Sequence, residues 1–109
     1  MIENISYKDN TEAKKWEVKL TGEIDIFNSD DVKSALLEML SEKEQNVYID
    51  CKELSYIDST GLSALVAILK KVKAYSGEVV LKNLLPNVFK VIKITNLDKL
   101  FIIEGDDNE

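Results

Sequence analysis

The sequence YIDSTGL at residues 56–62 decides the fold that we predict for this chain. It begins with apolar residues typical of a strand, passes through small polar residues and continues into a segment with helical spacing. This predicted helix extends from about residue 60 to residue 75 and carries an apolar stripe on one face. The residues of the stripe are Leu62, Leu65, Val66, Leu69 and Val72. The stretch therefore predicts a strand that leads directly into a long helix.

The residues before this stretch predict a strand hairpin and a first helix. Residues 2–8 and 15–21 have the pattern of short strands, and the polar residues 9–14 between them predict a hairpin loop. A helix is predicted at residues 28–40, because its first residues, Asn and Ser, can cap the free N–H groups of a helix. Its inner stripe is expected to contain Val32, Ala35, Leu36 and Met39.

The residues after it alternate between strand and helix patterns. The predicted elements are a strand at residues 46–51, which precedes the quoted stretch, strands at 78–82 and 100–103, and a helix at 86–94. This order of strand, helix, strand, helix and strand requires right-handed crossovers and parallel pairing. We therefore predict a single-domain α/β fold with a mixed sheet, in which an N-terminal antiparallel hairpin precedes a parallel βαβαβ unit packed by helices. The domain is expected to span residues 1–103, and residues 104–109 to form a flexible acidic tail.

The composition excludes several classes of protein. The chain has 109 residues, a net charge of −6, and 14 lysines but no histidine or arginine. Without histidine, Ser-His-Asp catalysis and ordinary zinc sites are excluded, and without arginine there is no bidentate clamp for phosphate. An acidic chain is also unsuited to nucleic acid or an anionic membrane. We expect no catalytic residue, metal, cofactor, nucleic acid or membrane partner.

The cysteine count and the lack of long apolar runs indicate the cellular compartment in which the protein is expected to act. Cys51 is the only cysteine, so no intramolecular disulfide can form. The first residues do not have the pattern of a secretion signal, and no stretch approaches the roughly 18 apolar residues of a membrane span. These features predict a cytoplasmic protein.

Free N–H groups and the positive end of a helix dipole gather where residues 58–61, DSTG, enter the long helix. Ser59 or Thr60 can simply cap the helix there, with Gly61 as a residue that permits close packing. One cap needs one hydroxyl, and this stretch has two.

A second polar point, residues 22–25 (GEID), follows the second predicted strand. Because strand ends gather at one edge of a sheet, Asp25 and Asp58 are candidates to lie near Ser59. Alternatively, Asp25 is an ordinary turn residue or a solvated charge.

The residues 22–25, the helix that follows them and the run 58–62 together resemble the STAS domain family, and specifically its bacterial anti-sigma factor antagonists. The DSTGL run is the specific part, and the resemblance extends from about residue 15 to residue 103. In that family the Ser directly after the Asp is phosphorylated by a partner anti-sigma factor that is itself a kinase. The resemblance therefore implies that Ser59 is the phosphate acceptor and that ATP and Mg²⁺ belong to the partner.

The resemblance also implies how the chain acts. The unphosphorylated form would bind the anti-sigma factor and free the sigma factor, and phosphorylation would end this binding, with a phosphoserine phosphatase as a further partner. We expect a monomer or weak dimer. The residues expected to bind the partner are Asp25, Asp58, Ser59, Thr60, Gly61, Ser63, Ala64 and Ala67. Two other functions stay open: a STAS scaffold that does not switch, in a signalling or transport complex, and a hydrolase using Ser59, which would lack a base.

The long helix has two features outside its apolar stripe. Ser63 stands where the family often has a Gly, so it places a side chain, and a second hydroxyl, near the expected docking surface. Ala64, Ala67, Ile68 and Tyr75 are either part of a wide buried face or, in the case of the small residues near Ser59, a flat docking surface.

Overall fold

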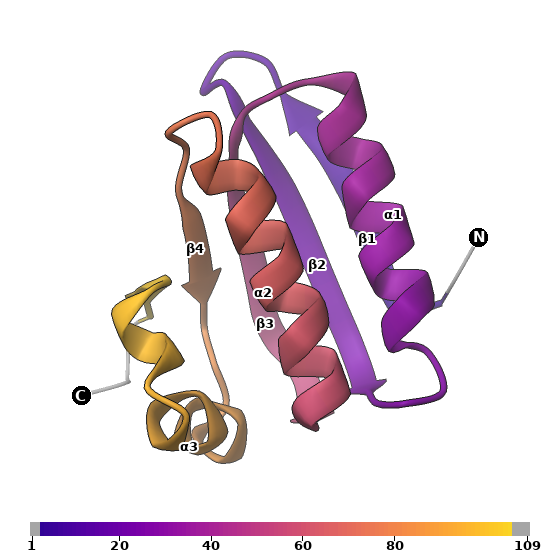
Figure 1. The fold of residues 1–109 in the computed structure, drawn as a ribbon, viewed down its shortest axis with the longest axis vertical. Coiled ribbons are helices and arrows are strands. Elements are labelled where there is room, and N and C mark those ends of the chain that lie inside the picture. Colours follow the sequence, from indigo (N-terminus) through magenta and orange to yellow (C-terminus); the bar gives the residue numbers. More distant parts are fainter. Residues whose placement is uncertain (1–2, 106–109) are drawn as a thin grey trace.

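The computed structural model describes residues 3–105 and confirms the α/β fold with a mixed sheet (Figure 1). Its elements are β1 (Ile5–Asn10), β2 (Lys15–Ile24), α1 (Ser29–Glu42), β3 (Asn46–Ile57), α2 (Ser59–Lys73), β4 (Val79–Lys82), α3 (Pro86–Ile94), the 3-10 helix η1 (Leu97–Lys99) and β5 (Ile102–Glu104). The strands follow one another across the sheet in chain order. Glu104, which the sequence placed in the tail, belongs to β5, and residues 106–109 lie outside the described residues.

The pairing of the strands agrees with the predicted topology. β1 and β2 pair antiparallel, whereas β2 with β3, β3 with β4 and β4 with β5 pair in parallel. The hairpin loop is shorter than predicted, because Asp9 and Asn10 are still paired with β2. The side chain of Asn10 accepts a hydrogen bond from the N–H of Ala13 (3.0 Å), and Lys14 adopts a left-handed φ of 57°, so four residues complete the turn.

β3 is twice as long as the strand predicted at residues 46–51, because it continues to Ile57. The prediction was wrong here because two register shifts between β2 and β3 interrupt the alternation of apolar and polar residues. Lys52 and Glu53 are both exposed at this irregularity, after which Leu54 and Ile57 return to the core. The added length carries β3 to the same edge of the sheet as the end of β2.

The last predicted strand was also wrong at its start. Instead of extending from residue 100, the chain forms η1 and enters β5 only at Ile102. The N–H groups of Leu100 and Phe101 both donate to the carbonyl of Leu97 (3.0 and 3.2 Å), so they are used in a turn rather than in the sheet.

The core lies between the sheet and the helices α1 and α2, which lie side by side on one face of it (Figure 1). Leu36 of α1, Ile49 of β3 and Ile68 of α2 are completely buried in it. The wide buried face predicted for the long helix is confirmed for Ile68 and Ala64, which pack inside, whereas Val66 was wrongly placed in the inner stripe and is only half-buried. Within residues 3–105, no helix is both long and apolar enough to cross a membrane.

Candidate partner-binding site at the start of α2

The parallel pairing of β2 and β3 brings the two polar segments of the sequence together. Ile24 and Ile57, the last residues of these strands, are register partners, so Asp25 and Asp58 follow them at one edge of the sheet. The N–H of Asp58 donates to the carbonyl of Ile24 (3.3 Å). Asp25 and Asp58 therefore both lie at the edge of the sheet where α2 begins.

Asp58 is the N-cap of α2, so the expectation that Ser59 or Thr60 caps the helix is wrong. Oδ1 of Asp58 accepts hydrogen bonds from the N–H groups of Thr60 (2.9 Å) and Gly61 (3.1 Å). It also accepts one from the Thr60 hydroxyl (2.6 Å). The hydroxyl of Thr60, followed by the N–H of Gly61, lowers the pKa of Asp58 below its ordinary value of 3.8, so this carboxyl is ionised at neutral pH and stays so in more acidic solution than an ordinary aspartate.

The two hydroxyls of the DSTG run differ in their accessibility. Thr60 is half-buried and its hydroxyl is used by Asp58, whereas Ser59 is exposed as the first residue of α2. The hydroxyl that an external enzyme can reach is therefore that of Ser59.

Gly61 allows α2 to start directly on the ends of two strands. A Cβ at this position would lie 2.6 Å from Cγ1 of Ile57 and 2.9 Å from the carbonyl oxygen of Ile24. Both atoms belong to the packed sheet, so a side chain would push the helix away from it. The close-packing role expected for Gly61 fits this geometry.

The loop between β2 and α1 is held by its own polar side chains. Oδ1 of Asp25 accepts from the N–H of Phe27 (3.0 Å), which makes Asp25 a turn residue as one alternative expected. Asn28 stands at the N-cap position of α1 but makes no capping hydrogen bond, contrary to expectation. Its side chain instead accepts from the N–H of Asp25 (2.9 Å) and donates to the carbonyl of Glu23 (2.8 Å), so it fixes the loop rather than the helix.

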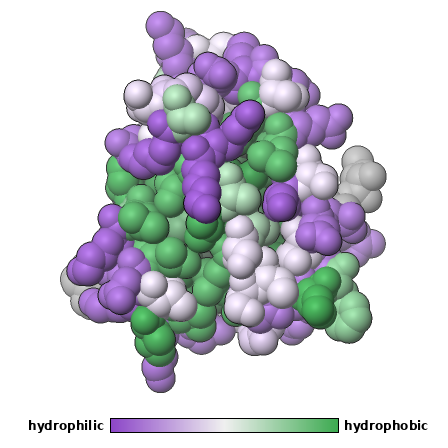
Figure 2. All heavy atoms as spheres, viewed as in Figure 1, coloured by the Kyte–Doolittle hydropathy of each residue, from purple (hydrophilic) through white to green (hydrophobic). Residues whose placement is uncertain are grey.

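Two hollows flank the first turns of α2. One, of about 300 Å³, lies toward α1 and is lined by Ile26, Ser29, Asp30, Lys33, Thr60, Ser63 and Ala64. The other, of about 460 Å³, lies toward η1 and is lined by Ser59, Leu62, Ser63, Val66, Ala67, Lys70, Thr95 and Leu97. Figure 2 shows a broad hydrophobic area on this second side of α2. Ser63 is exposed between the two hollows, whereas Gly61 and Ala64 are buried and offer a partner little surface.

Sequence reasoning missed the apolar members of this surface. Leu97 lies on η1, which had not been predicted, and Val66 had been assigned to the inner stripe. Ile26 and Phe27 had no periodic pattern that would mark them, although both are strongly exposed.

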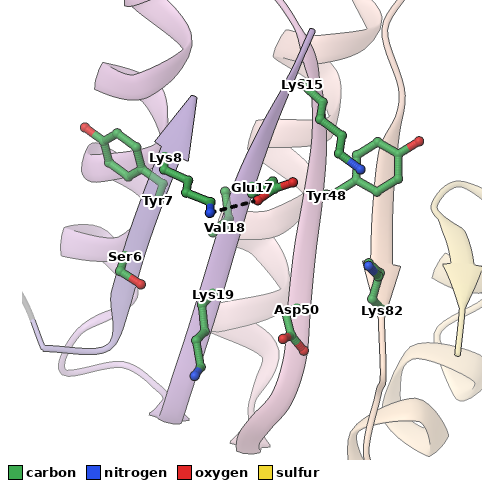
Figure 3. Close-up of a pocket in the computed structure, with 10 residues that line it drawn as sticks. All are labelled: Ser6, Tyr7, Lys8, Lys15, Glu17, Val18, Lys19, Tyr48, Asp50 and Lys82. Carbon is green, nitrogen blue, oxygen red and sulfur yellow. Dashed lines mark ion pairs between the residues drawn. The ribbon is translucent and has the colours of Figure 1, made fainter. Parts of the chain in front are cut away.

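The opposite face of the sheet, free of α1 and α2, has a different character (Figure 3). Lys8, Lys15, Lys19 and Lys82 are among the residues that line a shallow depression of about 390 Å³ on this face. Lys8 pairs with Glu17 (3.6 Å), and Lys15 lies 4.0 Å from the centre of the Tyr48 ring. Alternating charges and a cation–π contact are typical of a solvated sheet face.

The described residues contain neither a metal cluster nor an activated thiol. No group of three or more His, Cys, Asp or Glu residues suitable for a metal ion occurs among residues 3–105. Burial raises the pKa of the Cys51 thiol to about 12, so this cysteine stays protonated in the core. The exposed Ser59 and its ionised neighbour Asp58 are thus the chemical features that distinguish this edge of the sheet.

Comparison with known proteins identifies the class to which this fold and this site belong. The STAS domain model matches residues 8–108, and the chain belongs to the STAS domain family. The anti-sigma-B factor antagonist of Listeria monocytogenes is 36% identical over 94 residues, which cover 85% of this chain and 82% of that protein. The anti-sigma-B factor antagonist of Staphylococcus aureus (strain NCTC 8325 / PS 47) is 28% identical over 107 residues, with 97% and 99% covered. The resemblance to bacterial anti-sigma factor antagonists is confirmed.

Solved structures agree with the fold. The anti-sigma factor antagonist SpoIIAA in its unphosphorylated form has a TM-score of 0.81 at 18% identity, covering 95% of this chain and 89% of that one. The structure of this Bacillus cell fate determinant in its phosphorylated form has a TM-score of 0.73 at 17% identity, with 95% and 92% covered. At these identities the likeness concerns the arrangement of the chain in space.

Proposed function

We propose that this chain is an anti-sigma factor antagonist that is switched by phosphorylation of Ser59. In its unphosphorylated form it binds an anti-sigma factor with serine kinase activity and thereby frees a sigma factor. The observation that carries this proposal is the exposed Ser59 hydroxyl directly beside the ionised Asp58 at the start of α2. The names of the Listeria and Staphylococcus relatives support the antagonist role.

The chemistry of the switch belongs to the partner. Oγ of Ser59 attacks the γ-phosphorus of ATP, the bond from that phosphorus to the bridging oxygen breaks, ADP leaves, and the hydroxyl proton passes to a base of the kinase. The antagonist itself contributes no catalytic residue and needs no cofactor. A phosphoserine phosphatase would reverse the modification.

The effect of the phosphate follows from what already surrounds Ser59. At pH 7 a phosphoserine carries a charge of about −1.5 to −2. The N–H groups of Thr60 and Gly61, which could otherwise stabilise an anion, already donate to Asp58. A partner fitted to a neutral hydroxyl would therefore face a dianion next to a carboxylate, and such like-charge contacts at an interface cost several kcal/mol.

The remaining expectations belong to the same proposal. Asp25, Asp58, Ser59, Thr60, Ser63 and Ala67 bind the partner, and Gly61 and Ala64 support this surface from below. The chain acts in the cytoplasm as a monomer or weak dimer, through a protein rather than through nucleic acid, as its net charge of −6 favours.

A kinase assay tests the proposed acceptor. The anti-sigma factor that the unmodified chain captures from the native cytosol is identified, purified and incubated with the chain, ATP and Mg²⁺. Peptide mapping by mass spectrometry is expected to place one phosphoryl group on Ser59, to find none in Ser59→Ala, and to find normal modification in the control Ser34→Ala, which removes an exposed hydroxyl of α1. Modification only at Ser63 or elsewhere would reject the proposal, and capture unaffected by ATP would favour the scaffold function.

A further inference from the structure

The loop between β2 and α1, at the edge of the sheet where α2 begins, exposes two large apolar side chains. Ile26 is 68% exposed and Phe27 is 90% exposed, the highest value among the large hydrophobic side chains of the described residues. In Figure 2 a hydrophobic patch stands at the lower right edge of the molecule, at the place of this loop in Figure 1, with hydrophilic side chains above it. An aromatic ring so far outside the core contributes little to packing, and with Ile26 it forms an exposed apolar pair on one loop.

The backbone on both sides of Phe27 is fixed. The N–H of Phe27 donates to the Asp25 side chain (3.0 Å), and the N–H groups of Asn28 and Ser29 donate to the Asp25 carbonyl (3.2 and 2.8 Å). The Asn28 side chain binds the N–H of Asp25 and the carbonyl of Glu23. The ring is therefore held on an ordered loop, so binding of a partner would cause only a small loss of conformational entropy in the backbone of this loop.

The same loop is joined to the cap of α2. The N–H of Asp58 donates to the carbonyl of Ile24 (3.3 Å), and the backbone of Ile26 helps to lower the pKa of Asp58. Ile26 also lines one hollow together with Thr60 and Ser63. A protein that binds over the first turn of α2 would therefore meet the Ile26–Phe27 pair on the same surface.

We propose that Phe27 is the apolar anchor by which the chain holds the protein that phosphorylates Ser59, and that this protein has an apolar pocket for the ring. The inference depends on the proposed function and adds the chemistry of the partner surface. Aromatic side chains near the centre of an interface commonly supply most of its affinity. Because the ring is uncharged, its contribution is the same whether or not Ser59 carries a phosphate. Affinity and switching thus reside in different residues.

Binding and kinetic measurements on Phe27→Ala test whether Phe27 supplies affinity while Ser59 controls switching. We expect the Kd for the purified anti-sigma factor to rise by at least about tenfold. The KM for phosphorylation of Ser59 should rise by a similar factor. The kcat should stay within about twofold of the wild-type value, because the substitution does not change the acceptor hydroxyl. The factor in Kd should be the same in a Ser59→Asp background. Leu100→Ala, which shortens another apolar side chain that is 52% exposed, is the matched control and should change neither value.

The outcomes separate this inference from the function on which it depends. If the wild-type chain neither captures an anti-sigma factor nor is phosphorylated on Ser59, the proposed function fails and this inference fails with it. If the wild-type chain is phosphorylated on Ser59 but the Phe27→Ala variant has the same Kd and KM as the wild type, only the role of Phe27 as an anchor is rejected. Loss of self-association in Phe27→Ala, with kinase binding unchanged, would also reject it, because the ring would then serve contacts between copies of this chain.

Discussion

Asp58 connects three parts of the molecule through one carboxylate. It caps α2 through Thr60 and Gly61, the backbone of Ile26 helps to lower its pKa, and it stands next to the hydroxyl that we propose as the phosphate acceptor. The sequence could not identify it as the cap, because Asp, Ser and Thr are all good N-cap residues and only the backbone conformation selects one of them. In the structure Asp58 has the extended conformation of a cap and Ser59 is already helical.

The hydrogen bonds of Asp58 predict a pH-dependent contribution to stability. They hold its pKa below the ordinary value of 3.8, so the folded state loses this proton more readily than the unfolded state. The contribution is complete above the unfolded pKa and is lost as the pH falls through the lowered value. In urea unfolding, Asp58→Asn should be less stable than the unmodified chain at pH 7. The difference should shrink below about pH 4.

Asp58→Ala serves as the second variant in that series. It removes the acceptor altogether, so it should be less stable than Asp58→Asn, which keeps a side-chain oxygen for the N–H groups. Equal stability of all three proteins at pH 7 would contradict the assignment of Asp58 as the cap.

At the scale of the elements, the junction between β3 and α2 depends on how closely the helix approaches the strands. The sequence predicted both elements, since their periodicities differ clearly at residues 56–62. It could not predict the full length of β3, because the register shifts against β2 place Lys52 and Glu53 side by side in the exposed part of the strand. Irregularities of this kind depend on the partner strand, which lies far away in the sequence.

Gly61→Ala tests the close approach of the helix. The added methyl group would overlap Ile57 and the backbone of Ile24, so we expect a loss of about 1–3 kcal/mol in the free energy of unfolding. Chemical denaturation measures this loss, with the exposed Ser63→Ala on the same helix as control. A Gly61→Ala protein as stable as the unmodified chain would show that α2 can shift without cost.

At the scale of the whole molecule, the sequence predicted the topology and the position of the site. Parallel pairing and right-handed crossovers leave few arrangements for the observed order of elements, and they place the ends of β2 and β3 at one edge. What the sequence could not show is the outer surface. Whether Phe27, Val66 or Leu97 faces solvent depends on contacts between distant segments, and single exposed apolar residues leave no periodic pattern.

The net charge of the chain agrees with the direction that we propose for the switch. The chain already carries a charge of −6, and phosphorylation adds further negative charge at an edge that holds Asp25 and Asp58. The fold is expected to stay intact, because Ser59 is exposed and lies outside the core. We therefore expect the proposed modification to act on the complex rather than on the folded chain.

The most direct test of this account compares the affinity of the two forms of the chain for the purified anti-sigma factor by calorimetry. The unmodified protein and the protein fully phosphorylated on Ser59 are titrated without ATP, and circular dichroism confirms that both are folded. We predict that phosphorylation raises the Kd by roughly a hundredfold, in line with like-charge repulsion of several kcal/mol at an interface. Equal Kd values for the two folded forms would contradict the proposal that Ser59 is the switch.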